Sequence, residues 1–155
     1  MQIESSVFKN SERIPEKYTC DGERFLSPPL SIREVPEGTE SLVLIMDDPD
    51  VPTAIRPDGN FTHWVVFNIP ASATSIDEGE LIGVQGANTR GESRYTGPCP
   101  PPEYEPSTHR YFFMLYALDV MLNLSEGATK DEVLEALDGH VIETAELMGV
   151  YSKNP

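Results

Sequence analysis

The sequence predicts a mainly β protein, an antiparallel β-sandwich that ends in a C-terminal helical pair. Short apolar runs rich in β-branched and aromatic residues alternate with Pro-, Gly- and Asp-rich stretches over most of the chain. The helical signals lie only near the C-terminus, whereas a parallel α/β sheet would have helices between its strands. A chain of 155 residues without visible repeats or linkers is the size of one domain, residues 1–155.

Three runs, at residues 42–46, 64–67 and 111–116, are predicted to be central strands. Each is apolar at successive positions. Because neighbouring side chains of a strand point to opposite faces, each of these strands must be covered on both sides. Shorter and more mixed runs are predicted to form flanking strands at residues 3–6, 30–33 and 81–85.

Two short helices are predicted after residue 128. Thr129 and Glu132 have the spacing of a capping box, an apolar stripe follows at positions 133, 134 and 137, and Gly139 ends the helix. A second helix is predicted over about residues 140–148, ended by Gly149. Both are too short to be stable alone, so we expect them to dock on the β body.

The chain is strongly acidic. Eleven basic and 26 acidic side chains give a formal net charge of −15, which disfavours nucleic acid as a partner and extended docking on membranes. An anionic ligand must therefore be bound by a local pocket. The N-terminal residues do not resemble a signal peptide, and no apolar run approaches the ~18 residues of a spanning helix, so we expect a cytoplasmic protein.

The chain contains two cysteines, Cys20 and Cys99. They cannot form a framework of several disulfides, and neither belongs to a Cys-x-x-Cys pair. We expect two separate reduced thiols, with a single isolated bridge as the alternative. Only the distance between the two residues in the folded chain distinguishes these cases.

Polar residues lie at the ends of the three central runs. Asp48 and Asp50 follow the first run, His63 opens the second and His109 opens the third. If the first two runs pair antiparallel and the third joins them, these residues meet at one end of the sheet, where binding sites are often built from loops on a rigid scaffold. Each also has an ordinary explanation, as turn chemistry for Asp-Pro-Asp and as hydrogen-bonded structural histidines. Their joint placement is what favours a site.

Two proline-rich loops, at residues 48–60 and 98–106, adjoin these polar residues. Because proline fixes φ and lowers the entropy lost on ordering, we expect the loops to be preformed cavity walls rather than mobile lids. Proline also lacks an N–H group. Gly97 and Cys99 are therefore the nearby residues whose main-chain N–H groups can be offered to a ligand.

At these residues the chain resembles the phosphatidylethanolamine-binding protein family, also called the Raf kinase inhibitor-like family, and particularly its short prokaryotic branch. The resemblance runs in family order over nearly the whole chain. It rests on Ser27-Pro28-Pro29-Leu30-Ser31, Asp48-Pro49-Asp50-Val51-Pro52, His63-Trp64-Val65-Val66-Phe67-Asn68-Ile69-Pro70, Tyr95-Thr96-Gly97-Pro98-Cys99-Pro100-Pro101 and His109-Arg110-Tyr111.

This resemblance implies a β-sandwich with peripheral helices and a small anion-binding pocket at one end. The matching positions give the expected ligand-binding residues: Asp48, Asp50, His63, Gly97, Pro98, His109 and Tyr111.

The leading hypothesis is a non-enzymatic binding module, without metal or cofactor, for a phosphate-bearing anion. The ligand would be a phosphoethanolamine-like lipid headgroup or a phosphorylated residue, and the family name suggests regulation of kinases or other proteins. In this hypothesis an aspartate accepts a ring N–H of His63 or His109 and favours the imidazolium, whose other nitrogen donates to a phosphate oxygen.

Two alternatives belong to other classes of function. One is a metal-dependent hydrolase that uses Asp48, Asp50, His63 and His109 as ligands. The other is a protease or kinase inhibitor that acts through a protein surface. The sequence identifies no particular protein partner and leaves a homodimer open.

Overall fold

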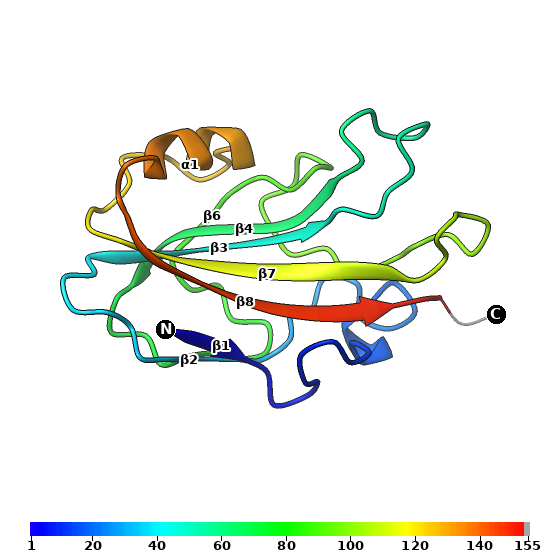
Figure 1. Cartoon of the computed structure of the whole chain (residues 1–155), viewed down its shortest axis with the longest axis horizontal. Coiled ribbons are helices and arrows are strands. Elements are labelled where there is room, and N and C mark those ends of the chain that lie inside the picture. The colour runs from blue at the N-terminus through cyan, green and yellow to red at the C-terminus, as the bar shows by residue number, and fades with distance from the viewer. Residues whose placement is uncertain (154–155) are drawn as a thin grey trace.

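The computed structural model, which describes residues 1–153, contains two antiparallel sheets and one α-helix within that range (Figure 1). The smaller sheet has the strand order β1 (Gln2–Glu4), β2 (Leu30–Arg33), β5 (Ser75–Ile76). The larger sheet has the order β6 (Val84–Gln85), β4 (Phe61–Pro70), β3 (Ser41–Asp48), β7 (His109–Leu118), β8 (Val141–Tyr151). The predicted mainly β sandwich is confirmed.

The middle strand of the larger sheet, β3, is buried on both faces. Leu42, Leu44 and Met46 belong to the apolar cluster shared with β1 and β2, whereas Val43 and Ile45 belong to a second cluster shared with the helix. Figure 1 shows the smaller sheet on one side of the larger sheet and the helix on the other. The continuous apolar run at 42–46 is therefore explained, as predicted, by cover on both sides.

The three central strands pair as the site prediction requires. β3 is antiparallel to both β4 and β7, with Met46 opposite Trp64 on one side and Phe113 on the other. The end of β3 thus lies beside the starts of β4 and β7. The loops that leave and enter these strands gather at one end of the molecule, on the right in Figure 1.

The first predicted helix is confirmed as α1 (Lys130–Leu137). Thr129 caps it by accepting the main-chain N–H of Glu132, and the Glu132 side chain accepts the N–H of Thr129 in return. Val133 and Leu137 are buried against the larger sheet. Within residues 1–153, no helix has the length and apolar content needed to cross a membrane.

The second predicted helix is wrong, because residues 141–151 form strand β8. This strand pairs with β7 along most of its length, from Val141 opposite Leu118 to Tyr151 opposite His109. Its C-terminal half has a two-residue burial period, at 147, 149 and 151, which the helical interpretation overlooked. Gly149, predicted to end a helix, lies instead in the strand, where a Cβ would come within 2.6 Å of Ile14.

The flanking strands differ from prediction mainly in length. The strand predicted at 30–33 matches β2, whereas the one predicted at 3–6 is Gln2–Glu4 and the one predicted at 81–85 is only Val84–Gln85. A short strand at Ser75–Ile76 was not predicted. It pairs with β2, and a two-residue strand leaves too little alternation in the sequence to be recognised.

The expectation of two separate reduced thiols is also wrong, because Cys20 and Cys99 form a disulfide across a sequence separation of 79. Main-chain hydrogen bonds bring their segments together: the N–H of Cys20 donates to the Pro98 carbonyl, and the N–H of Gly97 donates to the Arg24 carbonyl. A contact between segments so far apart in the chain leaves no signal in cysteine spacing.

The burial of β3 gives a stability prediction. Leu44→Ala removes a fully buried side chain from the cluster between the sheets and should cost about 2–5 kcal/mol of unfolding free energy, measured by urea denaturation. Leu81→Ala, at a position 74% exposed, is the matched control and should change stability by less than about 0.5 kcal/mol. Equal effects of the two variants would contradict the packing described for β3.

Candidate functional site

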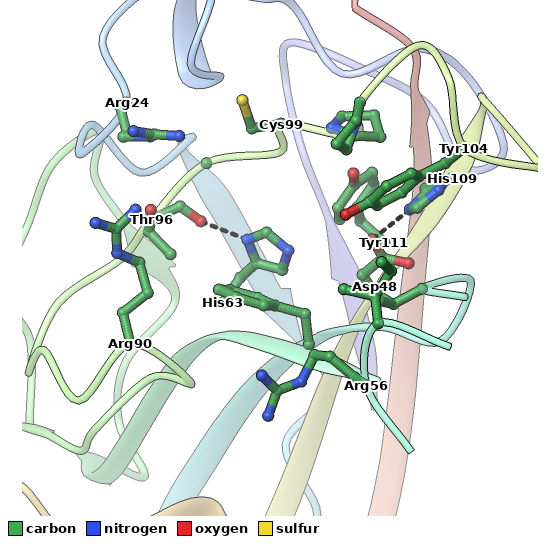
Figure 2. A pocket seen from close by; sticks show the side chains of 16 residues that line it. Arg24, Asp48, Arg56, His63, Arg90, Thr96, Cys99, Tyr104, His109 and Tyr111 are labelled. Carbon is green, nitrogen blue, oxygen red and sulfur yellow. Dashed lines mark hydrogen bonds and ion pairs between the residues drawn. The ribbon is translucent and has the colours of Figure 1, made fainter. Parts of the chain in front are cut away.

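A cavity of about 350 Å³ opens at the end of the larger sheet where the predicted polar residues meet (Figure 2). The strands contribute Asp48 from β3, His63 from β4, and His109 and Tyr111 from β7. Both proline-rich loops add to the wall, as expected. Their lining residues are Val51, Ile55 and Arg56 from the first loop and Cys99, Pro100, Pro101 and Tyr104 from the second.

Two of the seven residues expected to bind a ligand lie outside the cavity wall. Asp50 accepts two hydrogen bonds from the Arg110 guanidinium, at 3.0 and 2.8 Å, and a third from its main-chain N–H. The hydrogen bond from the Arg110 side chain lowers the pKa of Asp50. Pro98 does not line the cavity, and its carbonyl accepts the N–H of Cys20. Both residues therefore support the loops around the site.

Asp48 and His109 form a buried ion pair. The distance from His109 Nδ1 to Asp48 Oδ2 is 2.6 Å, and the other ring nitrogen, Nε2, lies 2.9 Å from the Pro106 carbonyl. Because both partners can only accept, both ring nitrogens must carry a proton. Burial alone lowers the pKa of His109, but the hydrogen bond and charge of Asp48 outweigh it, so the pKa is raised. Asp48 also accepts the N–H of Asp50, at 2.8 Å.

The Asp48–His109 pair supports the first part of the predicted mechanism, in which an aspartate favours an imidazolium, but not the second part, in which the other ring nitrogen donates to a phosphate. An aspartate does orient a histidine and favour its charged form, as expected. However, the nitrogen expected to donate to a phosphate, His109 Nε2, already donates to Pro106. His109 therefore supplies positive charge to the cavity wall, while its ring N–H groups are used inside the protein.

His63 has the opposite character. Its Nδ1 lies 2.7 Å from the Thr96 carbonyl, which can only accept, so Nδ1 carries the proton. Burial lowers the pKa of His63 to about 4, although the hydrogen bond to Thr96 opposes the shift. At neutral pH the ring is uncharged and its Nε2 is an acceptor. The expectation of an imidazolium donor at His63 is therefore not supported.

Tyr111 carries a buried hydroxyl that interacts only weakly with the Asp48 carboxylate and makes no hydrogen bond of ordinary length within the described residues. Its side chain is fully buried, and its ring meets that of His63 edge-on, with 5.2 Å between the centroids. Burial and the nearby charge of Asp48 raise the pKa of Tyr111, so the hydroxyl stays protonated. Since Tyr111 lines the cavity, its O–H is a donor that a ligand can use.

Gly97 has a structural role that the sequence did not indicate. Its N–H, expected to face a ligand, donates to the Arg24 carbonyl at 2.7 Å. A Cβ at this position would come within 2.2 Å of the Tyr18 carbonyl oxygen. Glycine is therefore required here because another main-chain segment passes close by, not because a ligand does.

Three arginines that the sequence analysis did not select also line the cavity: Arg24, Arg56 and Arg90. In Figure 2, Arg24 and Arg90 lie on the Thr96 side of His63 and Arg56 lies on the other side. They belong to a chain with only 11 Lys and Arg residues. Arg56 and Arg90 lie in loops near predicted polar residues, and this placement in a chain with few basic residues could have indicated them. Arg24 lies 24 residues before Asp48, so its position in the sequence gives no such signal.

The three arginines differ in the hydrogen bonds and ion pairs that they already form within the protein. Arg56 donates to the Asn60 carbonyl, and Arg90 pairs with Glu92 at 3.1 Å. Arg24 has no ion-pair partner among residues 1–153, and its Nε is buried without a hydrogen-bond acceptor. Arg24 is therefore the cation with the most capacity for a ligand.

The metal-dependent alternative has little support in this geometry. No group of three or more His, Cys, Asp or Glu side chains within residues 1–153 is placed to hold a metal ion. The residues proposed as ligands are engaged elsewhere: Asp50 by Arg110, and both ring nitrogens of His109 by acceptors.

The fold and cavity define a class: a β-sandwich protein with a pocket, lined by both charged and apolar side chains, at one end of its main sheet. The chain belongs to the phosphatidylethanolamine-binding protein family, whose sequence profile matches residues 4–152. The resemblance drawn from the sequence motifs is thereby confirmed.

Relatives from distant organisms are similar over their full length. The chain is 50% identical to the UPF0098 protein of Chlamydia trachomatis, covering 99% of this chain and 100% of that protein. It is 48% identical to the UPF0098 protein of Methanothermobacter thermautotrophicus, covering 99% of each.

Solved structures of related proteins are also similar to this chain over nearly its whole length. A crystal structure described as a phosphatidylethanolamine-binding protein homolog from Chlamydia trachomatis has a TM-score of 0.92 and 50% identity, covering 99% of this chain and 97% of that one. E. coli YbcL, described as a member of the mammalian family, has a TM-score of 0.87 and 30% identity, covering 99% and 98%.

The ion pair gives a testable prediction. Asp48→Asn should lower the pKa of His109, measured by NMR titration of the imidazole, because the carboxylate charge is lost while the amide oxygen can still accept from Nδ1. Asp50→Asn is the control. Asp50 is a smaller contributor to the raised pKa, so it should lower that pKa less. An equal decrease in both variants would contradict the assignment.

His63 gives a prediction about pH. Its pKa of about 4 when folded lies below the ordinary value of 6.5, so protonation favours the unfolded chain. The contribution of His63 is fully favourable above pH 6.5, and roughly 3 kcal/mol should be lost as the pH falls toward 4. His63→Asn keeps a donor for Thr96 but does not titrate, so denaturation curves should show a smaller loss. Parallel losses in both proteins would contradict the neutral imidazole.

Proposed function

We propose that the protein is a non-enzymatic binding module whose end cavity takes a small phosphate-bearing anion. The observation that carries this proposal is the charge of the cavity wall. Three arginines and the His109 imidazolium line it, against the single carboxylate of Asp48, in a chain with a formal net charge of −15. Since the general surface repels anions, cations gathered in one cavity favour an anionic ligand there.

The uncharged polar groups of the cavity indicate which kind of anion it can bind. The Tyr111 hydroxyl is a donor that interacts only weakly with Asp48 and makes no hydrogen bond of ordinary length to the described residues, whereas His63 Nε2 is an acceptor at neutral pH. A singly protonated phosphate has oxygens that accept and an O–H that donates, so it complements both groups. A cavity of about 350 Å³ lies at the small end of the range for ligand pockets and suits a headgroup-sized molecule.

A lipid headgroup and a phosphorylated side chain share this chemistry. The name of the family, phosphatidylethanolamine-binding protein, supports the first source. The net charge of −15 disfavours broad contact with an anionic membrane, so we propose recognition of one phosphate group at a time. Regulation of a partner protein through a phosphorylated residue would use the same cavity.

Calorimetric titration tests the proposal with inorganic phosphate, phosphoethanolamine and a phosphoserine peptide as separate ligands. We expect binding of inorganic phosphate and of at least one ester. Arg24→Met should weaken it roughly tenfold or more, because a charge-assisted hydrogen bond is worth about 1.5–3 kcal/mol. Comparison of the two esters identifies the source of the phosphate.

Arg33→Met is the matched control, because it removes the same charge from an arginine that pairs with Glu4 on the smaller sheet, away from the cavity. Arg33→Met should leave the affinity for each phosphate ligand unchanged within about twofold. Absence of binding by all three ligands, or equal weakening in both variants, would contradict the proposal. Stoichiometric zinc, manganese or iron in gently purified protein would favour the hydrolase instead.

A further inference from the structure

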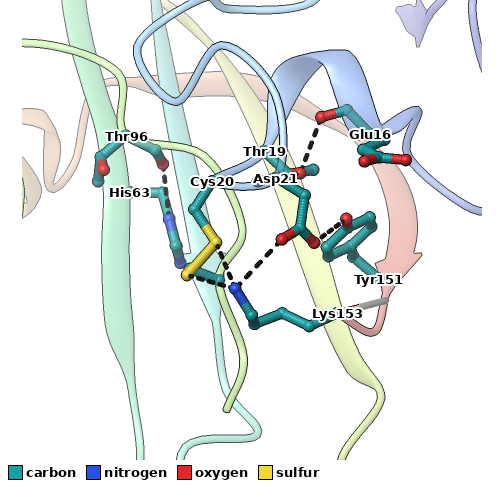
Figure 3. The surroundings of a disulfide bond; sticks show 9 residues. Glu16, Thr19, Cys20, Asp21, His63, Thr96, Tyr151 and Lys153 are labelled. Carbon is teal, nitrogen blue, oxygen red and sulfur yellow. Dashed lines mark hydrogen bonds and ion pairs between the residues drawn. A yellow bond between two sulfur atoms is a disulfide. The ribbon is translucent and has the colours of Figure 1, made fainter. Parts of the chain in front are cut away.

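The Cys20–Cys99 disulfide lies in the cavity wall, not in the sealed core. Cys99 lines the same cavity as His63 and Tyr111. Both cysteines are partly exposed, so an external reagent can approach the bond. Figure 3 shows the disulfide between the cavity side, near His63, and the C-terminal segment that follows β8.

A lysine ammonium is held against both sulfur atoms. Lys153 Nζ lies 3.5 Å from Cys20 Sγ and 3.9 Å from Cys99 Sγ. Asp21, next to Cys20 in the chain, accepts from the same ammonium at 3.1 Å and also accepts the Tyr151 hydroxyl (Figure 3). Lys153 is thus positioned by a carboxylate that is itself fixed to the end of β8.

The ammonium matters most when a sulfur becomes charged. A disulfide is neutral and gains little from a nearby cation, whereas a thiolate at 3.5–3.9 Å is stabilised by it. Thiol–disulfide exchange is faster when the leaving thiol has a lower pKa. A cation placed beside both sulfurs therefore favours opening of the bond and does little for the closed form.

We propose that Cys20–Cys99 is a reactive disulfide that exchanges with small thiols of the glutathione class, with Lys153 stabilising the thiolate that leaves. The external thiolate attacks Cys99 Sγ, the sulfur on the cavity wall, and the S–S electron pair passes to Cys20 Sγ, the sulfur nearer to Lys153. A second external thiol then displaces Cys99 from the mixed disulfide. Two external thiols are oxidised to one disulfide, and the two cysteines are reduced.

The exchange would act on the binding cavity. After reduction, the hydrogen bonds from Cys20 N–H to Pro98 and from Gly97 N–H to Arg24 still join the two segments, so the fold is kept. The wall from Cys99 to Tyr104 loses its covalent link. This coupling rests on the proposed function. If the anion binds best when the disulfide holds the wall in place, reduction weakens anion binding, and the bound anion disfavours reduction by the same free energy.

The test follows reduction of the folded protein by excess glutathione at one fixed pH near neutrality, with free cysteines counted by alkylation and mass spectrometry. Lys153→Met should slow reduction roughly tenfold, since the attraction is partly screened at this partly exposed site. Lys153→Arg should restore most of the rate. Lys9→Met removes an equal charge from an exposed lysine and should leave the rate unchanged.

Early samples, quenched with acid, should carry the glutathione adduct on Cys99. A wild-type rate in Lys153→Met, an adduct mainly on Cys20, or a bond that is reduced only after denaturant is added would each overturn the proposal. A rate in Lys9→Met as slow as in Lys153→Met would overturn the role of Lys153, because it would show an effect of net charge alone.

A separate experiment tests whether anion binding in the cavity and reduction of the disulfide are coupled. Inorganic phosphate, compared with sodium chloride at equal ionic strength, should lower the fraction of wild-type protein that is reduced at equilibrium in a fixed mixture of reduced and oxidised glutathione. An unchanged fraction, together with calorimetric binding of phosphate, would overturn the coupling. Absence of phosphate binding would overturn the proposed function and leave the Lys153 comparison as the test of the reactive disulfide.

Discussion

The structure depends on one constraint, the burial of β3 on both of its faces between two antiparallel neighbours. An uncovered face would expose either the cluster under the smaller sheet or the cluster under α1. Since β4 and β7 both run opposite to β3, the end of β3 must meet the starts of the other two. That arrangement places Asp48, His63 and His109 around one cavity before any loop contributes.

Within the cavity, hydrogen bonding gives the two histidines opposite roles. His109 lies between a carboxylate and a carbonyl and is held in its charged form, whereas His63 has a carbonyl partner on one nitrogen and is neutral. Two residues of one type thus supply a cation and an acceptor a short distance apart. Their difference follows from the strand ends and loops around them, not from the histidines themselves.

Two proline-rich loops contribute to the cavity wall, and Arg24, Arg56 and Arg90 concentrate positive charge there in a strongly acidic chain. The disulfide joins one of these loops to the N-terminal segment and lies beside the Lys153 ammonium. The proposed anion site and the proposed reactive disulfide share one wall, which provides a physical route by which the state of one can alter the other.

The sequence by itself determined the sandwich, the central strands, α1 and the end of the sheet where polar residues gather, because these features rest on local periodicity, capping and turn chemistry. Only the tertiary structure decided that residues 141–151 form a strand, that Cys20 meets Cys99, that Gly97 is required by Tyr18, and that three arginines face the cavity. Each of these depends on which distant segments come together. The local sequence pattern shows which residues favour a helix or a strand, but it does not show which distant segments pack against one another in the fold.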